Sequence, residues 1–245
     1  MTYKIFTVLS VLLFSFAYTT APGENTPSIN LISTEDLSVP VKELSIEEEI
    51  SQLYTLFSEK NSSIPSLTSF QNGMMGYYKL ASQNRVEKEI LTIIDFSLSS
   101  TQKRMWVLDM TTHEVLIHSV VAHGKNTGGE FATQFSNKVN SLQSSLGFYL
   151  TAETYMGGNG YSLFIDGVEE EFNSKARERY VVIHGAAYAN PESIKGMGRL
   201  GRSYGCPAVP TALTHEFIDT IKEKSVLYIH SNDKTYQTRS KMIRA

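Results

Sequence analysis

The single cysteine of the chain, Cys206, lies among residues that favour a reactive thiol. It belongs to the segment Gly201–Pro207, Gly-Arg-Ser-Tyr-Gly-Cys-Pro, which is polar and contains two glycines. A free cysteine often packs as a small apolar residue, but this composition predicts an accessible loop. With one thiol, neither an intrachain disulfide nor a cysteine-rich zinc site can form. The sequence therefore predicts a nucleophile, with a buried and inert thiol as the alternative.

The residues around Cys206 limit how its chemistry could be assisted. Gly205 permits the unusual backbone angles of a tight turn, which can direct successive N–H groups at one point. Pro207 has no N–H, so an oxyanion hole would use the amides of Cys206 and of the residues just before it. The next helix is expected to begin only near Thr211, too far along the chain for its dipole to help a thiolate. A histidine imidazolium is therefore the expected stabiliser of the thiolate.

His184 is the best candidate for that histidine. It ends the apolar run Val181–Ile183 and is followed by Gly185, so it is expected where a buried strand meets a loop. This position can hold an imidazole rigidly and keep it accessible; a purely structural histidine at a strand end is the alternative. The other histidines are rivals for the same role: His113, His118, His123, His215 and His230. None of them forms a His-x-x-x-His pair with a carboxylate base, so neither a metal nor another cofactor is expected.

Seven runs of β-branched and aromatic residues predict the strands that must position these two side chains. They are 91–96, 105–109, 115–121, 146–151, 161–165, 180–183 and 226–229. Between them, 126–140 predicts a polar loop, 172–179 a short helix and 185–210 a loop, and a further helix is expected from Thr211. Strands dominate this part of the chain, so the expected fold class is mainly β (α+β) with a few peripheral helices.

The N-terminal region predicts export. Met1–Lys4 is positively charged, and Ile5–Ala17 is almost wholly apolar but short for a membrane span. Residues 1–17 are therefore expected to be a signal peptide, with an uncleaved membrane anchor as the alternative, and 18–43 a linker. Exported proteins normally pair their cysteines, which strengthens the functional interpretation of the single thiol.

The rest of the chain divides into three expected parts. Residues Ser45–Glu48 have the pattern of a capping box, which opens a short helical N-terminal segment over 44–88. This segment includes a second helix over about 66–82 and is interpreted as a packing or spacer element. The expected catalytic domain is 89–231, and a basic tail follows over 232–245.

The composition excludes one class of partner. The chain has 245 residues, of which 41% are apolar and 19% charged, and its net charge is −3. These values are typical of a globular protein. A protein that binds nucleic acid usually carries a basic surface, so no nucleic acid partner is expected.

Two segments together resemble the catalytic region of the murein L,D-transpeptidases of the YkuD type. They are Val182-Ile183-His184-Gly185 and Gly198–Pro210, Gly-Arg-Leu-Gly-Arg-Ser-Tyr-Gly-Cys-Pro-Ala-Val-Pro. Within that family, the branch whose signature ends Gly-Arg-Ser-x-Gly-Cys-Pro is the most similar. The resemblance continues through four shorter segments and covers about residues 66–231. These segments are 91–97, 122–124, 135–137 and 144–149.

The resemblance implies an L,D-transpeptidase-like β-sandwich of mixed sheets, and it implies peptidoglycan stem peptides as substrates in the periplasm or cell envelope. It implies that Cys206 attacks the carbonyl of the third residue of a stem tetrapeptide and expels the terminal D-alanine. His184 would deprotonate the thiol and later activate the amine that receives the acyl group. The backbone amides of the oxyanion hole would be those of Gly205, Cys206 and Tyr204. The substrate-binding residues would be Arg202, Arg199, Ser203 and Gly185.

Three departures from the commoner family motif leave the acyl acceptor open. Tyr204 occupies the position of a second histidine, Ala208 that of an arginine or asparagine, and the separation of 22 residues between His184 and Cys206 is long. Transfer to water would make the protein an L,D-carboxypeptidase or related cysteine hydrolase, and a non-enzymatic wall-binding module is the alternative of a different class. Caspase-like, legumain-like and papain-like peptidases fit the composition of the cysteine segment or the order of histidine and cysteine less well.

Overall fold

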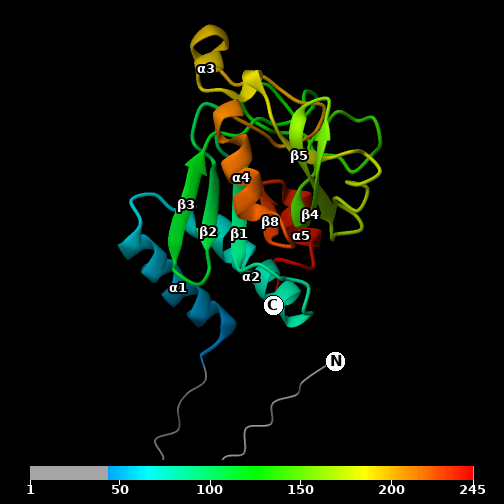
Figure 1. Ribbon diagram of the computed structural model, residues 1–245. Helices are drawn as coiled ribbons and strands as arrows, with labels where there is room; N and C mark the ends of the chain where they lie inside the picture. The colour runs from blue at the N-terminus through cyan, green and yellow to red at the C-terminus, as the bar shows by residue number, and fades with distance from the viewer. Residues whose placement is uncertain (1–43, 245) are drawn as a thin grey trace, which may run out of the picture. The chain divides into compact units, whose positions relative to one another are not determined.

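The structure, a computed structural model, describes residues 44–244 (Figure 1). The expected signal peptide, 1–17, and the expected linker, 18–43, lie outside the described residues. Among the helices of the described part, none combines the length and apolar character that crossing a membrane requires.

One mixed sheet of eight strands forms the centre of the described structure. Its strands are β1 (Ile90–Asp95), β2 (Met105–Asp109), β3 (Glu114–Ser119), β4 (Gly147–Gly157), β5 (Gly160–Gly167), β6 (Val182–Gly185), β7 (Ala208–Val209) and β8 (Val226–His230). Their order across the sheet is β3-β2-β1-β8-β4-β5-β6-β7. The pairs β1–β8 and β6–β7 are parallel, and the remaining pairs are antiparallel. The predicted mainly β class with mixed strand directions and peripheral helices is confirmed.

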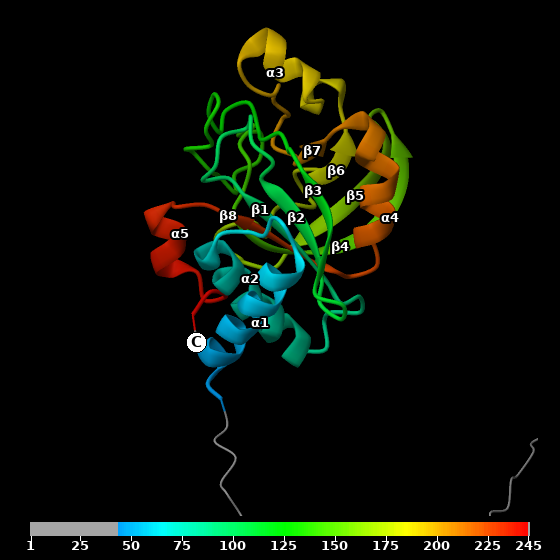
Figure 2. The same cartoon turned by 90° about the vertical axis from the view of Figure 1, so that its left-hand side faces the viewer.

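Two helices precede the sheet, and their ends follow from the sequence. α1 (Ile46–Lys60) begins at a capping box, in which the N–H of Glu48 donates to Ser45 Oγ at 3.2 Å and the N–H of Ser45 donates to Glu48 Oε2 at 2.8 Å. This pair satisfies two amide groups that the helix itself cannot. α2 (Leu67–Ser82) packs against β1 and β8, and α1 packs on α2 and β3 (Figure 2).

The segment predicted as a helix over 172–179 is a series of turns, and the prediction was wrong because of Asn173. The Asn173 side chain accepts from the N–H of Glu169 and donates to the carbonyls of Leu146 and Phe148, each at 2.9 Å. Asparagine side chains that bind backbone groups in this way compete with helical hydrogen bonds. Here they fix the segment to the start of β4.

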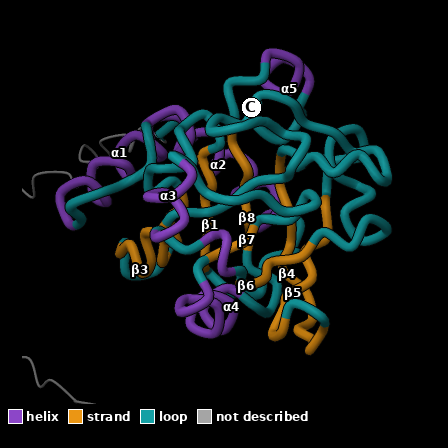
Figure 3. Tube along the Cα trace, turned by 90° about the horizontal axis from the view of Figure 1, so that it is seen from above, coloured by secondary structure: helices purple, strands orange, loops and turns teal. Residues whose placement is uncertain are grey.

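The predicted loop over 185–210 contains short regular elements. They are η1 (Ala187–Ala189), α3 (Glu192–Met197) and β7. The helix predicted from Thr211 begins as η2 (Thr211–Leu213) and continues as α4 (Thr214–Ile221), which contacts β5 and β6. The predicted tail contains α5 (Lys234–Arg239), and α4 and α5 lie on opposite sides of the strands (Figures 2 and 3).

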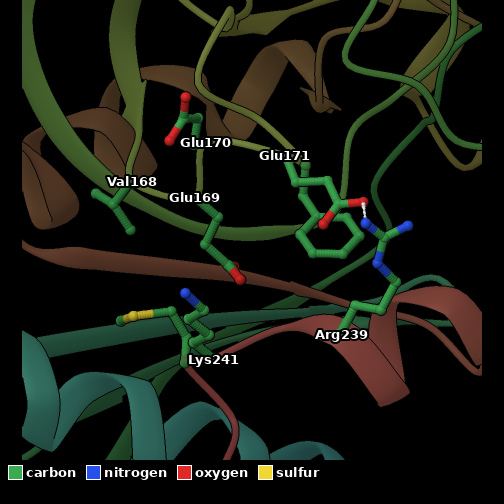
Figure 4. A pocket seen from close by; sticks show the side chains of 8 residues that line it. Val168, Glu169, Glu170, Glu171, Arg239 and Lys241 are labelled. Carbon is green, nitrogen blue, oxygen red and sulfur yellow. Dashed lines mark ion pairs between the residues drawn. The ribbon is translucent and has the colours of Figure 1, made fainter.

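A buried carboxylate holds the C-terminal segment against the sheet. Glu169 accepts hydrogen bonds from the N–H of Phe148 and the hydroxyl of Tyr236, both at 2.9 Å, and from Ser240 Oγ at 2.5 Å. Burial raises the pKa of Glu169. Figure 4 shows this carboxylate beside a cavity of about 620 Å³, with the ion pair of Glu171 and Arg239 at its edge. The hydrogen bonds of Glu169 thus tie α5 and the residues after it to the start of β4.

Helix α2 is expected to tolerate no added methyl group at Gly76. A Cβ there would lie 2.1 Å from Cζ of Phe148, a fully buried ring that stacks on Tyr228 with 4.3 Å between centroids. We expect Gly76→Ala to lower the free energy of unfolding by about 1–3 kcal/mol, measured by urea denaturation, because overpacking outweighs the better helix propensity of alanine. Gly196→Ala on α3 is the matched control, since a Cβ at Gly196 meets nothing within 4 Å. Equal destabilisation by both variants would contradict the packing argument.

Candidate active site

A cavity of about 590 Å³ brings together most of the side chains that the sequence singled out. Five of them line it: His184, Arg202, Ser203, Tyr204 and Cys206. Its volume falls in the range of small-molecule and peptide sites.

The sheet explains how two residues far apart in the sequence share one cavity. β6 carries His184 and runs parallel to β7, so that His184 pairs with Ala208, two residues beyond Cys206. On its other edge β6 pairs with β5, where Ser162 lies opposite His184. His184 is therefore held between two neighbouring strands, and Cys206 lies on the loop that leads into one of them.

Cys206 is partly exposed as a residue, and its thiol contacts two backbone groups of the described chain. Its Sγ accepts from the N–H of Val182 at 3.4 Å and donates to the carbonyl of Tyr180 at 3.5 Å. Burial raises the pKa of the thiol, while the Val182 N–H and the charge of Arg179 lower it. Because the net shift is upward, the resting thiol keeps its proton at neutral pH, and nucleophilic attack requires a base.

His184 has the protonation state of a base. Its side chain is buried, and Nδ1 lies 3.1 Å from the carbonyl oxygen of Gly185. A carbonyl can only accept, so Nδ1 carries the proton and Nε2 has a free lone pair. Burial lowers the pKa of His184, and the Gly185 carbonyl partly offsets that effect. The imidazole is therefore neutral near pH 7, unlike the imidazolium expected from the sequence, because the ring lies inside the sheet.

The loop before Cys206 is fixed by Ser203. Ser203 Oγ donates to the carbonyl of Cys206 at 2.6 Å and accepts from the N–H of Gly205 at 3.0 Å. Within the described residues, the N–H groups of Tyr204 and Cys206 have no hydrogen-bond acceptor, whereas that of Gly205 is already used. Two free amides thus flank one occupied amide on the candidate nucleophile loop, residues 203–206.

Gly205 meets a conformational requirement. Its φ of +127° lies in the region that favours glycine. A Cβ there would lie 2.9 Å from the carbonyl oxygen of Gln143, and Ser144 Oγ donates to the Gly205 carbonyl at 3.1 Å. The nucleophile loop and the segment around residue 144 are therefore in close contact, which only glycine at 205 permits.

A buried pair lies behind the nucleophile loop. The carbonyl of His123 accepts from the N–H of Ser203 at 3.0 Å, and His123 Nδ1 accepts from Arg104 Nη2 at 2.8 Å. Arg104 is fully buried and donates also to the carbonyls of Leu98 and Val121. Burial and, next, the Arg104 charge lower the pKa of His123 to about 4.

The lowered pKa of His123 predicts that the folded protein loses stability in acid. An unfolded histidine takes up a proton near pH 6.5, whereas folded His123 does so only near pH 4. Stability is therefore complete above pH 6.5 and falls as the pH drops toward 4, by roughly 3 kcal/mol from this group. Buried His184 and His230 act in the same direction, and Glu169, whose pKa is raised, acts in the opposite one.

The measurement is urea denaturation across this pH range with His123→Asn. The asparagine oxygen can still accept from Arg104 but does not titrate. The variant is expected to lose less stability than the wild type between pH 6.5 and 4. Parallel pH curves for the two proteins would contradict the assignment to His123.

The remaining predicted substrate-binding residues differ in position. Arg202 lines the cavity and donates through Nη1 to the carbonyl of Gly128 at 2.9 Å. Arg199 donates to the carbonyl of Leu200 at 2.7 Å and does not line the cavity. Gly185 does not line it either, because it packs against α4, where a Cβ would lie 2.0 Å from Thr214 Oγ1.

Sequence reasoning missed several residues at the cavity. Arg179 and Tyr180 line it, and both also line an adjoining cavity of about 240 Å³ with Tyr204. Tyr180 has a φ of +51°, unusual for an aromatic residue, and its ring is 71% exposed. Lys125, Asn159 and Tyr188 complete the missed set. The only signal in the sequence was the position of Arg179 and Tyr180 directly before the strand of His184.

The described residues contain no cluster of three or more histidine, cysteine, aspartate or glutamate side chains that could hold a metal ion. The described residues that line the cavity offer a thiol, a neutral imidazole and cationic side chains, and the loop of Cys206 adds two free backbone amides.

Comparison with family models and solved structures shows which known proteins the chain is similar to. The model of the L,D-transpeptidase catalytic domain matches residues 60–230. No match was found among curated proteins. Solved structures with similarity to the chain include the L,D-transpeptidase from Mycobacterium smegmatis, with 13% identity, a TM-score of 0.36 and 58% of each chain covered. L,D-transpeptidase 3 from Mycobacterium tuberculosis has 10% identity and a TM-score of 0.35, with 58% of this chain and 61% of that chain covered.

An L,D-transpeptidase from Stackebrandtia nassauensis has 11% identity and a TM-score of 0.35, with 77% of this chain and 78% of that chain covered. The chain thus spans less than two thirds of the length of the first two structures. The family model, in contrast, extends from the end of α1 to the end of β8 and includes the whole cavity. Since it matches more than half of the sequence, the chain belongs to the L,D-transpeptidase catalytic domain family.

Proposed function

We propose that this protein is a cysteine L,D-transpeptidase that acts on peptidoglycan stem peptides, in the branch with the Gly-Arg-Ser-x-Gly-Cys-Pro signature. The observation that supports the proposal best is the joint position of His184 and Cys206 in one cavity of a family member. A nucleophile, a neutral base and free amides are the parts that acyl transfer requires.

The first half of the reaction forms an acyl-enzyme. The thiol proton of Cys206 moves to Nε2 of His184, and Sγ bonds to the carbonyl carbon of the third stem residue. The carbonyl oxygen becomes negative and accepts from the N–H groups of Cys206 and Tyr204. The bond to the terminal D-alanine then breaks, and its amine takes the proton from His184. A thioester remains on Cys206.

The second half consumes the thioester. His184 takes a proton from the incoming side-chain amine of a diamino acid on another stem. The new amide bond forms, the C–S bond breaks, and Cys206 recovers its proton. The thioester conserves the energy of the original amide bond, so the exchange needs no nucleotide, which suits a reaction outside the cytoplasm.

Export is part of the proposal. The charged start Met1–Lys4 and the apolar run Ile5–Ala17 are the features that support a signal peptide. The substrate class of the family lies in the cell envelope, so cleavage after Ala17 and action in the periplasm or envelope follow from the same proposal.

A product assay tests the function. The purified protein is incubated with a disaccharide-tetrapeptide, and the products and the intact protein are measured by mass spectrometry. We expect dimers that lack one D-alanine, and a protein adduct with the mass of the disaccharide-tetrapeptide minus D-alanine. Tripeptide alone would indicate hydrolysis by an L,D-carboxypeptidase. Unchanged substrate with folded protein would contradict an enzyme and favour a wall-binding module.

A further inference from the structure

The position of Arg179 points to a source of positive charge for the nucleophile. The guanidinium lies against the nucleophile loop: a Cβ placed on Gly205 would be 3.4 Å from Arg179 Nη2. Arg179 also lines both the cavity of Cys206 and the adjoining smaller cavity. It therefore stands where the two cavities meet, next to the residue that precedes the thiol.

The partners of Arg179 leave its charge uncompensated. Nη1 donates to the carbonyl of Ser136 at 2.7 Å and to Ser145 Oγ at 3.2 Å. Nη2 donates to Ser141 Oγ at 3.3 Å and to the carbonyl of Gln143. All four acceptors are neutral, and in residues 44–244 Arg179 forms no ion pair with a carboxylate.

A nearby arginine, Arg177, differs from Arg179 because ion pairs neutralise its charge. Arg177 lies on the same segment, two residues earlier, and forms ion pairs with Asp166 at 2.7 Å and with Glu153. Its charge is neutralised where it stands. Arg179 instead is half-buried, and a partly desolvated cation without a counter-ion acts more strongly on neighbouring groups than a solvated one.

The other titratable groups at the cavity do not supply the positive charge that acts on the thiol of Cys206. Burial lowers the pKa of His184, which is therefore neutral near pH 7, and burial raises the pKa of Tyr188 to about 12. Lys125 and Arg202 also line the cavity, but the cation whose charge lowers the pKa of Cys206 is that of Arg179. Burial lowers the pKa of Arg179, and the charges of Tyr149 and Cys206 partly offset that effect.

We propose that Arg179 supplies the permanent positive charge that stabilises the Cys206 thiolate and attracts an anionic group of the substrate to it. This inference rests on the proposed role of Cys206 as nucleophile. In this arrangement His184 accepts the thiol proton and Arg179 holds the negative sulfur that remains. The four neutral bonds keep the guanidinium in place between the two cavities.

Thiol alkylation tests this role without requiring turnover. The rate of alkylation of Cys206 by iodoacetamide is measured against pH for the wild type, Arg179→Gln, Arg179→Lys and Arg177→Gln. We expect Arg179→Gln to move the pH midpoint upward and to slow alkylation about tenfold at pH 7, because less thiolate is present. Arg179→Lys, which retains the charge, and Arg177→Gln, which removes a compensated charge, are expected to stay near the wild type.

Iodoacetate, the anionic analogue of the same reagent, supplies a second readout. The iodoacetate to iodoacetamide rate ratio at high pH, where the thiol is ionised, is expected to fall severalfold in Arg179→Gln and to be retained in Arg179→Lys. In the wild type it is expected to exceed the ratio for N-acetylcysteine, a comparison that needs no variant. Equal behaviour of the lysine and glutamine variants would overturn the proposal and show that the hydrogen bonds alone matter.

These results are separate from the fate of the proposed function. If wild-type protein makes no cross-linked product but the midpoint and ratio change as expected, the charge assignment holds and the transpeptidase proposal fails. If product forms and neither readout changes in Arg179→Gln, the enzyme proposal holds and the role of Arg179 fails.

Discussion

Replacing Cys206 with alanine is expected to abolish formation of cross-linked dimer, with a loss of at least about 10⁴-fold in kcat/KM. The variant has no atom that can form the thioester, and the described cavity offers no second thiol. The mass adduct of the intact protein should disappear together with the product. Both are measured in the same mass spectrometry experiment.

The variant should keep its fold, which makes the loss interpretable. Among residues 44–244 the thiol makes only two weak hydrogen bonds, at 3.4 and 3.5 Å, and both partners are backbone groups of the segment before His184. The thermal midpoint of Cys206→Ala is therefore expected to stay close to that of the wild type. A folded alanine variant that still released D-alanine would place the nucleophile elsewhere and would falsify the proposed mechanism.

Replacing His184 with alanine is expected to reduce kcat/KM by about 10²- to 10⁴-fold, the range for loss of a general base. The residue should also determine the acid limb of the pH profile. Because its pKa is lowered, wild-type activity is expected to hold as the pH drops through 6.5 and to fall only below that value, when the ring becomes protonated. The pH profile of His184→Ala should lack this acid limb. Iodoacetamide should also alkylate Cys206 more slowly in this variant than in the wild type near neutral pH.

His215→Ala is the matched control for this prediction. His215 was a rival base from the sequence, but it is exposed on α4, where its ring stacks on Tyr161 with 4.8 Å between centroids. Its replacement should leave activity and the pH profile nearly unchanged. A larger effect at 215 than at 184, or equal alkylation rates for wild type and His184→Ala, would remove His184 from the mechanism.

Local patterns in the sequence predicted most of the elements, because strands and capped helices depend on neighbouring residues. The run 91–96 predicted β1, and the Ser45–Glu48 pattern predicted the start of α1. The pairing of strands could not be predicted in this way, since β8 reaches its place through contacts with residues more than 70 positions away. The turns over 172–179 escaped prediction for a related reason: Asn173 binds carbonyls at 146 and 148.

At the candidate site, too, local sequence predicted some features, and features that depend on distant contacts escaped prediction. His184 and Cys206 were singled out by their residue types and by motif, and the structure places them in one cavity. The lowered pKa of His184 could not be predicted, because burial in the sheet, which causes it, is not visible in a short motif. Arg179 was missed because its acceptors lie 34 to 43 residues away, on a segment that returns to the nucleophile loop only in the folded chain.

The position of β8 in the sheet has a consequence for folding during synthesis. This strand is the last of the described sheet in chain order, yet it joins β1, with Leu91 paired to Val226, and β4, with Gly147 paired to Ile229. Until it emerges from the ribosome, β1–β3 and β4–β7 have no common neighbour, and closing so distant a pair is slow. The two halves of the sheet are therefore expected to join only after β8 has been synthesised.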